Sequence, residues 1–109
     1  MKVLCQEEGK RVTLRLQGEL DHHAAREVMS EIGRAVDTRL PLCCVMDFSG
    51  VEFMDSSGIA VVLGAYRRMQ ELGGALEIQH VPSQAGRVFL AAGVDRIVPM
   101  QNAECRMQK

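Results

Sequence analysis

The stretch Val51-Glu52-Phe53-Met54-Asp55-Ser56-Ser57-Gly58-Ile59-Ala60-Val61-Val62-Leu63-Gly64 decides the fold that the sequence predicts. An apolar strand pattern ends just before it, at Phe48, and a helical pattern begins inside it. Asp55, Ser56 and Ser57 stand at the junction, and all three are residue types that favour the N-cap of a helix. Two hydroxyl groups are therefore expected where a helix has unpaired N–H groups and a partial positive charge.

Ser56 is the residue at this junction for which the sequence suggests a function. The N-terminus of a helix accommodates an added anion well, so we hypothesise that Ser56 receives a phosphate group. The alternative is that Ser56 only caps the helix, a role worth about 1 kcal/mol. The two roles can also be divided, with Asp55 or one serine capping the helix and the other serine exposed. On this hypothesis the chain is a binding module that phosphorylation switches, and it is not a catalyst.

Ser56, Ala60 and Gly64 recur at intervals of four residues and so form one row along a helix predicted at residues 57–72. This row of small side chains would let another protein approach the helix closely. The alternative is packing inside the same domain, since a glycine within a helix costs about 1 kcal/mol relative to alanine and some contact should require it. The stripe predicted to face the core comprises Ile59, Val62, Leu63, Tyr66 and Met69.

The rest of the chain predicts a single α/β domain over residues 1–109. Two early strands predict an antiparallel hairpin, and the later strand–helix–strand units predict right-handed parallel crossovers in a small mixed sheet. Asp21 is the expected cap of the first helix. Strand patterns occupy residues 3–5, 12–16, 42–48 and 75–81, with a short extended piece at 94–99. About four helices are expected, at 21–36, 57–72, 83–92 and in the polar tail 102–109, which should fray.

Composition excludes several functional classes. The net charge of −1 argues against direct binding of nucleic acid, which basic patches recognise. No apolar run approaches the roughly 20 residues of a membrane span, and acidic residues follow the N-terminus too soon for a signal peptide. The sequence therefore predicts a cytoplasmic protein. The four cysteines include no Cys-x-x-Cys pair, and Cys43 and Cys44 are expected to be reduced, small hydrophobic residues.

The sequence gives little support to metal binding or hydrolysis. His22 and His23 are adjacent and point in different directions at a helix start, whereas zinc ligands are spaced along the chain. Ser56 lacks the first glycine of a Gly-x-Ser-x-Gly elbow because Met54 occupies that position, and no glycine-rich phosphate loop is present. We therefore expect no catalytic residue, metal or cofactor, and a small serine hydrolase is the weakest alternative.

Several motifs together resemble a known family. They are Gly18-Glu19-Leu20-Asp21-His22-His23, Phe53-Met54-Asp55-Ser56-Ser57-Gly58, Val61-Val62-Leu63-Gly64, Gly73-Gly74 and Phe89-Leu90-Ala91-Ala92-Gly93-Val94. They resemble the anti-sigma factor antagonists of the STAS family over nearly the whole chain. The Glu-Leu-Asp-His-His segment points more narrowly to the sporulation branch, the antagonists of the anti-sigma F factor. The polar tail 102–109 departs from the longer apolar final helix of that branch.

This resemblance implies partner switching. An unphosphorylated antagonist of this family binds an anti-sigma factor, which is a serine kinase carrying ATP or ADP, and so releases the sigma factor, sigma F in the sporulation branch. The kinase phosphorylates the first serine after the motif aspartate, here Ser56, and a PP2C-type phosphatase resets the protein. An alternative with the same fold is a STAS scaffold or accessory subunit in stress signalling or lipid transport. The residues expected to bind the partner are Asp21, Asp55, Ser56, Ser57, Gly58, Ala60, Val61 and Gly64.

Overall fold

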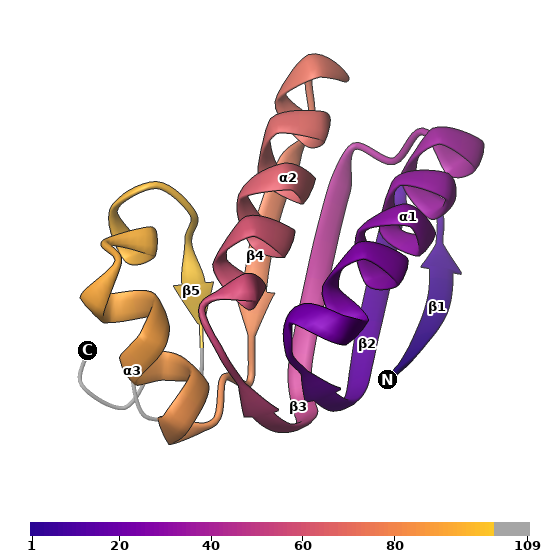
Figure 1. Ribbon diagram of the computed structural model, residues 1–109. Coiled ribbons are helices and arrows are strands. Elements are labelled where there is room, and N and C mark those ends of the chain that lie inside the picture. Colours follow the sequence, from indigo (N-terminus) through magenta and orange to yellow (C-terminus); the bar gives the residue numbers. More distant parts are fainter. Residues whose placement is uncertain (102–109) are drawn as a thin grey trace.

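The structure is a computed structural model of the chain, and it describes residues 1–101 (Figure 1). Five strands form one sheet in the spatial order β1-β2-β3-β4-β5. The strands are β1 (Lys2–Glu8), β2 (Arg11–Leu20), β3 (Cys43–Met54), β4 (Ala75–Gln79) and β5 (Met100–Gln101). The helices are α1 (His22–Arg39), α2 (Ser57–Glu71) and α3 (Ser83–Ala91), and a 3-10 turn, η1, spans Val94–Arg96.

The first two strands form the predicted antiparallel hairpin. They pair from Lys2 opposite Gln17 to Glu8 opposite Arg11. Gly9 in the turn has a φ of 62°, a left-handed conformation that glycine adopts at low cost. The remaining neighbours, β2–β3, β3–β4 and β4–β5, are all parallel. The predicted mixed α/β sheet, antiparallel at its first hairpin, is therefore confirmed.

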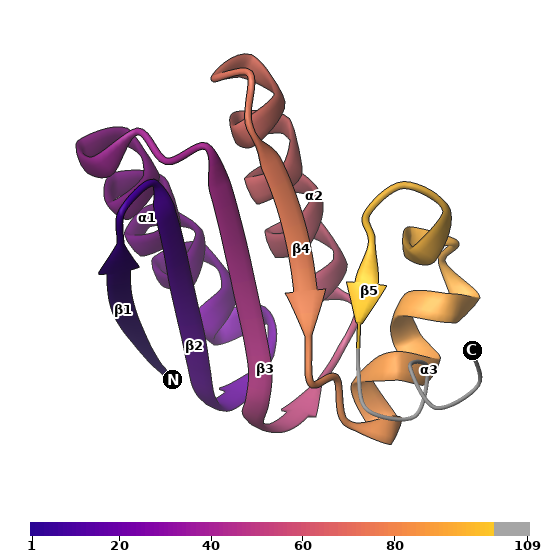
Figure 2. The same cartoon turned by 180° about the vertical axis from the view of Figure 1, so that it is seen from behind.

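The core lies between the sheet and its helices, of which α1 and α2 run side by side over one face of the sheet (Figure 1). In the reverse view the sheet lies in front of these two helices (Figure 2). Helix α3 adds Ala85 and Phe89 to the same core. Val12, Leu14 and Leu16 alternate along β2 and are fully buried, as the strand pattern predicted. The buried residues that α1 contributes are Ala25, Val28, Ile32 and Val36.

Strand β3 is longer than predicted. The apolar pattern placed its end at Phe48, whereas the strand continues to Met54. The reason is tertiary: β2 remains paired with β3 as far as Leu20 opposite Met54, through two shifts of register. The longer strand places Asp55 directly after its end, so only Asp55 and Ser56 lie between β3 and α2.

The segment 94–99 is not the extended piece that was predicted. Gly93 adopts a left-handed φ of 74°, and Val94–Arg96 then forms the turn η1. The Val94 carbonyl accepts hydrogen bonds from Ile97 and Val98 at 2.9 Å each. The chain becomes extended only at β5, where the Pro99 carbonyl accepts from the backbone of β4.

The buried face of α2 also differs from the prediction. Ile59, Leu63 and Tyr66 are only half-buried. The reason is that α1 packs along α2, so α2 buries a face directed at α1 as well as at the sheet. The residues that α2 buries are Gly58, Val61, Val62, Ala65 and Met69.

Within residues 1–101 the chain has three α-helices and one 3-10 turn. The fourth helix was predicted in the tail 102–109, which lies outside the described residues. None of the helices in the described part of the chain is long and apolar enough to cross a membrane.

Candidate functional site

The candidate site is the connection between β3 and α2, residues 54–58, which we call the Ser56 turn. Ser56 is the N-cap residue of α2, has helical backbone angles (φ −63°, ψ −16°) and is exposed. Its side chain makes no capping hydrogen bond. Instead, Oδ1 of Asp55 accepts a hydrogen bond from the Ser57 backbone at 2.8 Å. Of the alternatives predicted, the division of roles is the one observed: Asp55 caps the helix and Ser56 is exposed.

Asp55 also connects α2 to α1. Its second oxygen, Oδ2, accepts a hydrogen bond from the His22 backbone at 3.3 Å and lies 4.0 Å from Nδ1 of the His22 ring. The hydrogen bond from the Ser57 backbone is the largest influence that lowers the pKa of Asp55 below its ordinary 3.8, and the Ser57 side chain and His22 lower it further. The carboxylate is therefore ionised at neutral pH and serves the starts of two helices.

Asp21 lies next to this turn for a topological reason. Leu20 and Met54 are partners at the ends of the parallel strands β2 and β3, so the residues that follow them, Asp21 and Asp55, emerge at the same edge of the sheet. Oδ1 of Asp21 accepts hydrogen bonds from the backbones of His23 and Ala24, each at 3.1 Å, and so caps α1 as predicted. Two carboxylates and the exposed Ser56 are thereby gathered at two adjacent helix N-termini.

Gly58 and Val61, predicted to contact a partner, lie in the core beneath this surface. Val61 is 1% exposed, and Gly58 is buried. A Cβ atom on Gly58 would overlap Cγ and Sδ of Met54 and lie 3.3 Å from Cδ2 of Leu20. Their burial corrects the prediction: the helix face that carries these two residues packs inside the domain.

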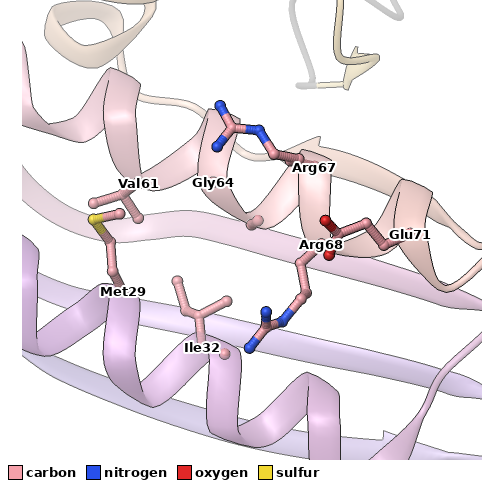
Figure 3. Close-up of a pocket in the computed structure, with 9 residues that line it drawn as sticks. Met29, Ile32, Val61, Gly64, Arg67, Arg68 and Glu71 are labelled. Carbon is pink, nitrogen blue, oxygen red and sulfur yellow. The ribbon is translucent and has the colours of Figure 1, made fainter.

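Gly64, the last residue of the small-residue row of α2, borders a groove between α1 and α2 (Figure 3). Ala60 is exposed and Gly64 is half-buried. A Cβ atom on Gly64 would lie 3.4 Å from Cε of Met29, which is an ordinary contact with a flexible side chain. The groove has a volume of about 330 Å³ and is lined by Met29, Ile32, Gly33, Val61, Gly64, Ala65, Arg67, Arg68 and Glu71. The row is therefore not closed off by close packing within the domain.

One residue of the site was not predicted, Gln84 in the first turn of α3. Its Oε1 accepts from the Met54 backbone N–H at 2.9 Å, and its Nε2 donates to the Met54 carbonyl at 2.8 Å. Strand β4 pairs with β3 only as far as Gln79 opposite Asp47. The amide of Gln84 thus bonds to the end of β3 beyond the reach of β4. A single polar residue in a helix carries no sequence signal for a contact 30 residues away.

Within residues 1–101, the histidines and cysteines are not gathered into a metal site. The rings of His22 and His23 lie 4.0 Å apart between centroids. In the part of the chain that the structure describes, no group of three His, Cys, Asp or Glu side chains is placed to hold a metal ion. Cys44 is buried, and burial raises its pKa to about 12, so it remains a thiol. Cys43 is half-buried and Cys5 is exposed.

Comparison with known proteins agrees with this geometry. A family model described as STAS domain matches residues 3–105 of the chain. A protein named anti-sigma F factor antagonist from Paenibacillus polymyxa is 33% identical over 91 residues, which cover 84% of this chain and 78% of that protein. The solved structure of the anti-sigma factor antagonist SpoIIAA in its unphosphorylated form aligns with a TM-score of 0.81 and 28% identity, over 94% of this chain and 88% of that one.

A second solved structure, of the Bacillus cell fate determinant SpoIIAA in the phosphorylated form, aligns with a TM-score of 0.70 and 26% identity. It covers 98% of this chain, which in turn covers 97% of it. These matches confirm the resemblance to anti-sigma factor antagonists that the motifs predicted. Because the family model spans nearly the whole chain, the chain belongs to the STAS domain family.

Proposed function

We propose that this chain is an anti-sigma factor antagonist that binds an anti-sigma serine kinase through the Ser56 turn and the neighbouring Asp21. The observation that carries the proposal is the division of roles in the turn: Asp55 caps α2, which leaves the exposed Ser56 hydroxyl uncommitted to capping. The names of the relatives from Paenibacillus and of the SpoIIAA structures support the same function. The exposed Ala60 and half-buried Gly64 extend the contact surface along α2.

Phosphorylation of Ser56 is the proposed switch. In the kinase the Ser56 Oγ forms a bond to the γ-phosphorus of ATP, the bond from that phosphorus to the bridging oxygen breaks, and ADP leaves. The hydroxyl proton passes to a base on the kinase or to water. A PP2C-type phosphatase reverses the modification by hydrolysis, with water as nucleophile and inorganic phosphate as product. A relative solved in a phosphorylated form supports this assignment.

Electrostatics explains how one phosphate would end the complex. A phosphoserine adds about −1.5 to −2 charges and three acceptor oxygens. On Ser56 these charges would stand beside the ionised carboxylate of Asp55, and the N-terminus of α2 would help the folded protein to tolerate them. At an interface that fits a neutral hydroxyl, like charges cost several kcal/mol, and each 1.4 kcal/mol is about tenfold in affinity.

The partner proposed is the anti-sigma F kinase in its ATP- or ADP-bound form, so that binding releases sigma F. The relative from Paenibacillus polymyxa, named an anti-sigma F factor antagonist, supports this choice over other sigma factors. Since sigma factors act on RNA polymerase, the proposed site of action is the cytoplasm. The protein itself acts as a binding module and as the substrate of the kinase.

Phosphopeptide mapping tests the proposal. The full chain is incubated with the cognate anti-sigma kinase and magnesium-ATP, next to the matched variants Ser56→Ala and Ser57→Ala. We expect one phosphate, on Ser56, which is lost in Ser56→Ala and retained in Ser57→Ala. Phosphate only on Ser57 would refute the residue assignment. Tight binding without phosphate would instead indicate a constitutive docking module.

A further inference from the structure

Gln84 contacts the end of the strand that leads into the Ser56 turn. Its side chain belongs to α3, yet both ends of its amide bond to the backbone of Met54, at 2.9 Å and 2.8 Å. Met54 is the last residue of β3 and immediately precedes Asp55. The contact is partly buried and spans 30 residues of sequence. It therefore fixes a backbone position directly before the Ser56 turn.

The two edges of β3 differ in what holds them near Met54. On one side Met54 is paired with Leu20 of β2, and the Asp55 backbone N–H donates to the Leu20 carbonyl at 3.2 Å. On the other side β4 ends its pairing at Asp47, so the backbone of β3 after that residue has no β4 partner. Gln84 supplies the missing donor and acceptor at the last residue. Met54 is thereby held on both edges, as in the middle of a sheet.

Only a side-chain amide can make this pair of bonds. A primary amide carries a carbonyl acceptor and an N–H donor on one planar group, and so imitates a neighbouring strand. Glutamate lacks the donor at neutral pH, and leucine, which branches at Cγ and not at Cδ, has neither a donor nor an acceptor. The identity of Gln84 is thus explained by the backbone of Met54 and not by the propensity of α3.

We propose that Gln84 is a positioning residue for the phosphoacceptor: its amide holds Met54 so that Ser56 is presented at a fixed place beside the start of α2. This inference rests on the proposed function, because it assigns Gln84 a part in the phosphorylation of Ser56. Small displacements of a reacting group are costly for transfer reactions, since 1 Å can lower a rate about 100-fold. Losing the Gln84 anchor of the turn, with the Asp55 contacts intact, should lower the rate of phosphorylation about tenfold.

The test compares Gln84→Leu with Gln70→Leu in the full chain. Gln70 is the matched control because its amide donates to the Tyr66 hydroxyl on the same helix, at the end of α2 far from Ser56. We expect Gln84→Leu to lower kcat/KM for phosphorylation by the cognate kinase about tenfold, mostly through kcat, at a temperature where all variants are folded. Gln70→Leu should leave both constants unchanged. A loss of stability alone would not change kcat under these conditions.

Amide hydrogen exchange in the free protein separates this inference from the proposed function. If Gln84 positions the turn, Gln84→Leu should speed exchange of the Met54 and Ser57 amides, and Gln84→Glu, which keeps one acceptor, should protect Met54 partially. Wild-type exchange at Ser57 together with wild-type kcat would overturn the positioning role even if Ser56 is phosphorylated. Faster exchange in a protein that the kinase does not phosphorylate would refute the proposed function and retain Gln84 as an anchor of the turn.

Discussion

Gly58→Ala and Gly64→Ala introduce the same methyl group into the same helix, and the structure predicts effects of opposite sign. At position 58 the new Cβ overlaps Cγ and Sδ of Met54, a side chain that is fully buried. Leu20, 3.3 Å away, closes the remaining space, and the Met54 backbone is held by Gln84. At position 64 the nearest atom is Cε of the exposed Met29, at 3.4 Å.

The magnitudes follow from two opposing effects. Replacing glycine by alanine within a helix contributes up to about 1 kcal/mol of stability. Overpacking a closed core costs about 1–3 kcal/mol, because neighbouring side chains must leave their preferred rotamers. We expect Gly58→Ala to lose about 1–2 kcal/mol in net free energy of unfolding, since the helix gain is smaller in the first turn. Gly64→Ala should gain about 0.5–1 kcal/mol, because its contact is ordinary.

Urea unfolding followed by circular dichroism, together with thermal melts, measures both variants. A change of 1 kcal/mol corresponds to about 4–8 °C in Tm for a domain of this size. In the background of Met54→Ala, which removes the overlapping atoms, Gly58→Ala should no longer destabilise the protein, and this coupling identifies the cause. If Gly58→Ala unfolds at the same urea concentration as wild type, or if its cost persists without the Met54 side chain, the packing argument is wrong.

Three further predictions concern charge and reactivity. Ser56→Asp should fold normally and bind the anti-sigma kinase at least tenfold more weakly in titration calorimetry, and equal affinity would count against charge repulsion as the switch. Asp55→Asn should make the free energy of unfolding depend less on pH in the acid range. A carboxyl whose pKa is lower in the folded state stabilises the fold at pH values above its ordinary pKa of 3.8, and this stabilisation is lost as the pH falls through the lowered pKa. Urea unfolding over a pH series measures that slope, and an unchanged slope contradicts the role of Asp55. A maleimide reagent should label the exposed Cys5 in the native protein and spare the buried Cys44, as mass spectrometry of peptides can determine.

Local signals in the sequence were enough for much of the fold. Asp21 was predicted to cap α1, and it accepts from two backbone N–H groups there. The alternation of Val12, Leu14 and Leu16 predicted one buried face of β2. These predictions hold because capping and alternation depend on residues close together in the chain.

The features that the sequence did not predict share a different origin, since each depends on a neighbour that is distant in sequence. Strand β3 runs past Phe48 because β2 continues to pair with it, and no local pattern reports that pairing. Val61 was placed on the outer face of α2, and the packing of α1 against α2 buries it. The role of Gln84 could not be predicted because its partner is the backbone of a residue that it contacts only in the folded chain.

The shared carboxylate of Asp55 has a consequence for how the Ser56 turn opens. Its bond to His22 closes a loop of 33 residues that contains all of α1, while its bond to Ser57 spans two residues. The bond to His22 is also the longer of the two, at 3.3 Å against 2.8 Å for the bond to Ser57, and is therefore the weaker hydrogen bond. Local fluctuations should therefore break the two contacts in sequence: the bond to His22 opens first while α1 stays packed on the sheet and α2, and the bond to Ser57 survives until α2 itself unwinds. A single side chain thus gives this region a hierarchy of two opening events with different lifetimes.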